Sequence, residues 1–214
     1  MTKSNADPKT QLIELHAKLI QWLGDDAYPR WALHGIDARN GGFVETLGQN
    51  GLGAPQPRRA RVQARQIYAF AQAPALGWHG DVSGIVRRGT DYFTAHYRRR
   101  DGLFRTLAAA DGAVVDERAL LYDQAFALLS LAAAAVALDA RGEFETRALA
   151  LRGAIESRLS TADGSLRSDE ATHAVRESNP HMHLLEACLA LYEATGKQNY
   201  LIRARALLLS LIHI

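Results

Sequence analysis

Polar and apolar residues are distributed along the chain in a pattern that repeats about every sixty residues. Each period contains a glycine turn, a helix that begins polar and becomes apolar, and then a more ordinary amphipathic helix. The turn glycines Gly42, Gly102 and Gly164 lie 60 and then 62 residues apart. A constant period of this length is typical of folds built from stacked helical hairpins.

The helices that begin polar are predicted at residues 61–70, 121–129 and 179–187. The second continues through the alanine run 132–135 and is apolar almost all round, which predicts a helix buried on every side. In the third, Asn179 is predicted as the N-cap, Pro180 as the first helical residue and Gly196 as the stop. The amphipathic helices are predicted at roughly 10–23, 83–98, 143–159 and 198–211.

Buried helices that alternate with amphipathic ones predict an all-α fold, an α/α-toroid with an inner ring of helices inside an outer ring. Parallel inner helices would bring their polar beginnings to one mouth. Short β-hairpins are expected in the loops, most clearly at Asp111-Gly112. The alternative is an open α-solenoid that binds protein. Polar and aromatic clusters recur at the same helix end, which favours a shared pocket and hence the toroid.

The number of periods bears on how much of a ring the chain can form. It holds about three and a half periods, and three helical hairpins cannot close a double ring. Residues 207–214 are apolar and end without a cap. We therefore expect residues 1–214 to be a single domain, the N-terminal half of an (α/α)6 barrel whose C-terminal half is missing, and to be inactive alone.

Composition and charge restrict the classes of partner. The formal net charge of +2 gives no electrostatic case for nucleic acid or an anionic membrane. The basic clusters at 58–61 and 98–100 are interpreted as solvated helix flanks. The single Cys188 cannot form an intrachain disulfide, which fits a reducing compartment, and no apolar run approaches the length of a membrane span. We expect a soluble, cytoplasmic protein; no feature fixes its oligomeric state.

Candidate chemistry gathers at the polar beginnings of the inner helices. Asn179 and His183 are four residues apart and share a helix face. His183 suits a general acid or base because an unperturbed histidine has a pKa of about 6.5. Arg65 can polarise a sugar oxygen and stabilise an enediolate-like anion, and Tyr122 and Asp123 can hydrogen-bond hydroxyl groups. Each residue alone has a structural explanation, but their common phase in the repeat favours one site.

Metal and nucleotide sites are not expected. His181 and His183 are two residues apart, so on a helix they point about 200° apart, whereas helical zinc sites favour a spacing of four. The chain contains no Gly-x-x-x-x-Gly-Lys-Ser/Thr, Gly-x-Gly-x-x-Gly or Gly-x-Ser-x-Gly element.

These candidate residues lie in stretches that resemble the N-acylglucosamine 2-epimerase family, especially its mannose isomerase branch. The matching stretches are residues 41–45, 61–71, 76–78, 121–126 and 179–187. The resemblance implies an (α/α)6 barrel and reversible proton transfer at C2 of a sugar, with no metal or other cofactor. The substrates it implies are mannose, glucose and fructose, N-acylmannosamine and N-acylglucosamine, and cellobiose.

The resemblance also implies roles for individual residues. Arg65 would contact the sugar at the pocket floor, Asn179 would bind a hydroxyl, and His183 would do acid/base or sugar-binding work. Tyr122 and Asp123 would lie near the sugar. The family's principal pair of catalytic histidines has no counterpart among these 214 residues.

The implied chemistry leaves isomerase and epimerase open, because both reactions begin with removal of the C2 proton. The strings at 63–68 and 121–126 favour aldose–ketose isomerisation of mannose to fructose. One alternative is N-acylglucosamine 2-epimerase activity. Another is action on mannose 6-phosphate, for which Arg58, Arg59 and Arg61 lie near the mouth. A third, of a different class, is an inactive helical-repeat fragment that binds protein or carbohydrate.

Overall fold

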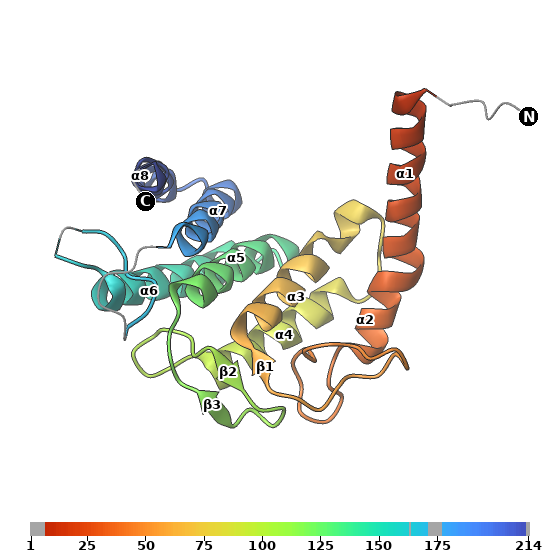
Figure 1. Cartoon of the computed structure of the whole chain (residues 1–214), viewed down its shortest axis with the longest axis horizontal. Helices are drawn as coiled ribbons and strands as arrows, with labels where there is room; N and C mark the ends of the chain where they lie inside the picture. The colour runs from red at the N-terminus through yellow and green to blue at the C-terminus, as the bar shows by residue number, and fades with distance from the viewer. Residues whose placement is uncertain (1–6, 163, 171–176, 213–214) are drawn as a thin grey trace, which may run out of the picture.

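The computed structural model describes residues 7–162, 164–170 and 177–212. Its helices fan out in consecutive pairs, with α1 and α8 at opposite sides of the array (Figure 1). The helices are α1 (Pro8–Trp22), the π-helical η1 (Leu23–Ala27), α2 (Tyr28–His34), α3 (Ala60–Gln72), the 3-10 turn η2 (Ala73–Leu76), α4 (Val82–Tyr97), α5 (Leu121–Ala137), α6 (Arg141–Leu159), α7 (Ser178–Thr195) and α8 (Gln198–Leu211). The strands are β1 (Arg58–Arg59), β2 (Leu107–Ala108) and β3 (Val114–Asp116).

The helices form an inner and an outer layer, as the sequence predicts. α5 packs between α3 and α7, and each of these inner helices carries the outer helix that follows it: α4 on α3, α6 on α5 and α8 on α7. Side chains near the starts of the inner helices contact one another, Arg61 with Asp123 and Tyr122 with His183. The inner helices are therefore parallel, with their beginnings at one mouth.

The turn glycines occupy equivalent places in the three units. Gly42, Gly102 and Gly164 have φ values of 68°, 91° and 79°, in the left-handed region that favours glycine. An isolated antiparallel bridge closes each turn block, and these bridges join Ile36 to Phe43, Arg98 to Phe104 and Ser160 to Leu166. The predicted period is thus confirmed in the backbone.

A buried glutamine ties each of the first two turn blocks to its inner helix. The side chain of Gln63 accepts from the Phe43 N–H at 2.8 Å and donates to the Phe43 carbonyl at 2.7 Å. Gln124 makes the same pair of bonds to Phe104, at 2.7 and 2.8 Å. Satisfying both ends of a buried amide in this way fixes the loop against the helix. In the third unit a buried leucine, Leu184, follows His183 where Gln124 follows Asp123.

Loops at the mouth join neighbouring units. β1 pairs antiparallel with β2, and β2 forms a hairpin with β3 whose turn contains Gly112, which confirms the hairpin predicted there. The N–H of Ala60, the first residue of α3, donates to the carbonyl of Thr106 at 2.9 Å. The N–H of Leu121, the first residue of α5, donates likewise to Ser168 at 3.0 Å. Each bond satisfies a helix-terminal donor with the loop of the next unit.

Helix α7 begins earlier than predicted. Glu177 is its N-cap and Ser178 its first residue, so the assignments of Asn179 as N-cap and Pro180 as the first helical residue are wrong. Both lie within the first turn, where N–H groups have no intrahelical acceptor and proline is therefore tolerated. Gly196, with φ of 71°, ends the helix as predicted.

Two clustered arginines are packed rather than solvated. Arg58 is 3% exposed; one η-nitrogen donates to Asp37 and the other to the Gly41 carbonyl. Arg99 donates to Asp101 and Glu170. The interpretation of both clusters as solvated flanks is wrong for these two residues because each has carboxylate partners at the loop junctions. No helix among the described residues is both long and apolar enough to span a membrane.

Candidate functional site

Three predicted site residues meet at the mouth of the inner helices. Arg65 of α3 donates from an η-nitrogen to the hydroxyl of Tyr122 of α5 at 2.6 Å. The Tyr122 ring lies 5.2 Å from the His183 ring of α7, centre to centre, at an interplanar angle of 88°. Three successive inner helices thus contribute to one set of contacts, as their phase in the repeat predicts.

Phe126 lies at the centre of this set. Its ring is 5.1 Å from that of Tyr122 and 4.5 Å from that of His183. The Arg65 guanidinium carbon lies 4.1 Å from the centre of the Phe126 ring, a cation–π arrangement. Phe126 was not among the predicted site residues, although it follows Tyr122 by one helical turn and shares its face. Phe126 therefore holds the arginine and histidine side chains side by side.

His183 has a carboxylate partner on its own helix. Its Nδ1 lies 2.9 Å from a carboxylate oxygen of Glu186, one turn further along α7. In the tautomer in which Nδ1–H donates to Glu186, Nε2 carries the lone pair that a general base requires. The side chain is 26% exposed, so it combines a fixed orientation with access to a ligand.

Asp123 differs from the other site residues because it is completely buried. One carboxylate oxygen accepts from Nε of Arg61 at 2.9 Å, and the other accepts from the hydroxyl of Thr106. Burial raises the pKa of this carboxyl, and the bonds from Arg61 and Thr106 offset only part of that rise. These contacts orient Arg61, which the sequence predicts near the mouth. A sugar contact by Asp123 stays a prediction.

Asn179 and His181 complete the predicted set on α7. Asn179 is exposed in the first turn, one turn before His183, and its role in binding a hydroxyl stays a prediction. His181 is 1% exposed, and its Nδ1 lies 2.8 Å from the Glu177 carbonyl oxygen. The two histidines have different surroundings, as their two-residue spacing predicts.

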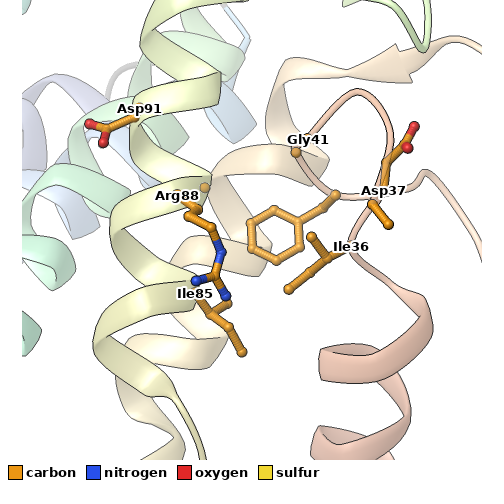
Figure 2. A pocket seen from close by; sticks show the side chains of 10 residues that line it. Ile36, Asp37, Gly41, Ile85, Arg88 and Asp91 are labelled. Carbon is orange, nitrogen blue, oxygen red and sulfur yellow. The ribbon is translucent and has the colours of Figure 1, made fainter.

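A separate cavity of about 490 Å³ lies between the turn after α2 and helix α4. Its apolar lining includes Ile36 and Ile85, while the carboxylates of Asp37 and Asp91 point away from them (Figure 2). Asp37 is already held by Arg58. The cavity therefore brings no acid and base together, and the mouth of the inner helices remains the candidate active site.

Comparison with known proteins identifies relatives of the chain. A profile of the N-acylglucosamine 2-epimerase (GlcNAc 2-epimerase) family matches residues 41–214. The chain is 42% identical over 180 residues to mannose-6-phosphate isomerase from Rhizobium meliloti (strain 1021), a match that covers 84% of this chain and 46% of that protein. It is 34% identical over 168 residues to D-mannose isomerase from Thermobifida fusca, covering 72% and 40%. The chain spans less than half the length of these curated relatives.

Solved structures share the fold. Cellobiose 2-epimerase from Spirochaeta thermophila DSM 6192 superposes with a TM-score of 0.83 at 22% identity, over 97% of this chain and 55% of that one. A D-mannose isomerase superposes with a TM-score of 0.77 at 21% identity, over 97% and 51%. These likenesses and the observed helix layers confirm the predicted all-α toroid.

Proposed function

The chain belongs to the N-acylglucosamine 2-epimerase family, and on that premise we propose that it provides part of the active site of a sugar isomerase or epimerase acting at C2. The observation that carries the proposal is the meeting of Arg65, Tyr122 and His183 from three successive inner helices. A cation, a phenol and a carboxylate-oriented imidazole within one cluster are the groups that proton transfer beside a carbonyl requires.

The reaction requires no other reactant than the sugar. A base takes the proton from C2 of the open-chain aldose, the electron pair of that bond forms the C1=C2 double bond, and the carbonyl oxygen gains a proton. The product is a cis-enediol. Delivery of a proton to C1, with loss of the proton on O2, gives the ketose. Delivery to C2 from the opposite face, with loss of the proton on O1, gives the epimer.

The cluster supports a division of these steps among its residues. The free Nε2 of His183 exchanges a proton with the sugar, with Glu186 holding the ring. Arg65 stabilises the negative charge that develops on the carbonyl oxygen, because a positioned cation acts on charge as it forms. Tyr122, whose hydroxyl is held by Arg65, and Asn179 bind sugar hydroxyls. Asp123 acts through Arg61.

The substrate we propose is an aldohexose of the mannose type, converted to the ketose. The names of the two curated relatives, which refer to mannose and to mannose 6-phosphate, support this choice. Epimerisation at C2 is the second candidate, favoured by the family to which the chain belongs. Both products arise from one enediol and differ in the carbon that receives the proton. A single experiment that identifies this carbon therefore distinguishes isomerisation from epimerisation.

The experiment is to incubate the whole protein encoded by the gene, rather than residues 1–214 alone, with mannose in deuterium oxide. Isomerisation places solvent deuterium at C1 of fructose, whereas epimerisation places it at C2 of glucose. Tyr122→Phe is expected to slow the exchange about tenfold or more, because it removes a hydroxyl hydrogen-bonded to a charged group. Tyr192→Phe, on the same set of inner helices but outside the cluster, is the matched control. Formation of neither fructose nor glucose would contradict the proposal.

A further inference from the structure

Arg61 is bonded in a way that leaves most of its guanidinium available. It donates to Asp123 through Nε, and its side chain remains 23% exposed. Neither η-nitrogen of Arg61 has a hydrogen-bond partner within the described part of the chain. The guanidinium carbon lies 5.0 Å from the centre of the Tyr122 ring, so the free edge of the group lies within the candidate active site.

Two other packed arginines, Arg58 and Arg99, are bonded differently. Both η-nitrogens of Arg58 donate, one to Asp37 and one to the Gly41 carbonyl. Both η-nitrogens of Arg99 donate to carboxylates. In these two residues the planar fork of the guanidinium is used within the protein, as a structural role requires. Arg61 is oriented through Nε alone, which presents its fork to a ligand.

Two cationic side chains lie close together in this cluster. Arg61 and Arg65 are one turn apart on α3, and their guanidinium carbons lie 5.0 and 5.7 Å from the Tyr122 ring centre. Like charges at this helical spacing repel. Asp123 is a buried carboxylate bonded to Arg61, and Glu186 is bonded to His183. An anion bound by the η-nitrogens of Arg61 would relieve this repulsion between the two guanidinium groups.

We infer that Arg61, oriented by Asp123, binds the phosphate of a phosphorylated aldose and so makes a sugar phosphate the preferred substrate of the proposed reaction. The inference rests on the proposed function and names the substrate class of the same site. A guanidinium fork matches two phosphate oxygens at once. Tyr122 contacts both Arg61 and His183, so a phosphate held by Arg61 and a sugar carbon near His183 belong to one cluster.

The test compares kcat/KM for mannose 6-phosphate with kcat/KM for mannose in the gene product. The wild type is expected to prefer the phosphate ester. Arg61→Lys keeps a cation beside Asp123 but removes the fork, and should lower the preference about 10- to 100-fold. The double variant Arg61→Met/Asp123→Asn removes both charges together, strands no buried carboxylate, and should lower it at least as much. Arg141→Lys, at the start of the outer helix α6, paired with Asp139 and with its side chain 55% exposed, is the matched control.

Two results would overturn the inference: equal kcat/KM for both sugars in the wild type, or an unchanged preference in Arg61→Lys. If neither sugar is turned over, the proposed function fails, and calorimetric titration with mannose 6-phosphate decides the role of Arg61 separately. Binding that weakens tenfold or more in Arg61→Lys, but not in Arg141→Lys, supports the phosphate site. Equal affinities in the two variants would refute it.

Discussion

Helices α5 and α1 both carry many apolar residues, yet they differ completely in burial. Fourteen of the 17 residues of α5 are buried, whereas none of the 15 residues of α1 is. α5 packs against α3, α4, α6 and α7, while the main contacts of α1 are with η1, which continues it. Figure 1 shows α1 projecting away from the helix pairs. Apolar periodicity thus defines the face that a helix can bury, and its neighbours determine whether that face is buried.

The largest expected effect is a direct test of this difference in packing. Leu128 in α5 is 1% exposed and Leu15 in α1 is 57% exposed. Leu128→Ala should lower the free energy of unfolding by about 2–5 kcal/mol, because it removes buried methyl groups and leaves a cavity. Leu15→Ala should change it by less than about 0.5 kcal/mol. Urea unfolding of both variants provides the measurement, and equal losses would contradict the comparison.

The next effect separates two kinds of position within one inner helix. His183→Ala should reduce turnover about 100-fold or more if its imidazole transfers protons, with little change in stability. His181→Ala should chiefly lower stability, since His181 is 1% exposed and packed at the start of α7. Steady-state kinetics and thermal unfolding of both variants are the measurements. Equal and mild losses of turnover would show that His183 has another role.

A smaller effect concerns the charged contact that connects the loop after α2 to the start of α3. Burial alone would raise the pKa of Asp37, but bonds from Arg58, Asn40 and Arg39 outweigh it and hold that pKa well below its usual range. A depressed pKa contributes stability above the unfolded-state value of about 4, and the contribution is lost as pH falls below it. Asp37→Asn should therefore cost about 2–4 kcal/mol at pH 7.

The pH dependence of the destabilisation by Asp37→Asn is an internal control for the role of the Asp37 charge. The difference in unfolding free energy between wild type and Asp37→Asn should shrink as pH falls from 4 towards 2, because the Asp37 carboxyl of the unfolded wild type then binds a proton while that of the folded protein stays ionised. A difference that stays constant over this range would mean that Asp37 stabilises the loop by its shape and neutral hydrogen bonds rather than by its charge.

Much of the fold could be predicted because it depends on local patterns. The turn glycines, the outer helices and the burial of α5 follow from periodicity and residue type. The start of α7 could not be placed, since Pro180 fits any position in a first helical turn. A proline near the start of a helix therefore locates the first helical residue only to within a few positions.

The candidate site could be predicted only in part, for a different reason. The repeat phase brings Arg65, Tyr122 and His183 to one mouth, but it does not specify which groups bond there. The bond between Arg61 and Asp123 joins residues 62 positions apart on different helices. No local pattern predicts such a contact, so the burial of Asp123 and the free fork of Arg61 emerged only in three dimensions.

The smallest expected effect on stability comes from replacing exposed leucines of α1. The same replacements are expected to have a large effect on self-association of the polypeptide. Leu12, Leu15 and Leu19 are 69%, 57% and 59% exposed and follow one another along one face of the helix. Replacing Leu12 and Leu19 by glutamate should change the unfolding free energy by less than about 0.5 kcal/mol, because these side chains lose no burial.

Soluble monomers seldom expose apolar patches above a few hundred Å². We therefore expect a polypeptide of residues 1–214 to self-associate, to turn over no sugar alone, and to shift towards monomer in the double variant. Light scattering at several concentrations measures this, with Lys18→Glu as the control for added negative charge. A wild-type polypeptide of residues 1–214 that stays monodisperse and monomeric would contradict the expected association. One that also converts mannose to fructose would contradict the expected lack of turnover.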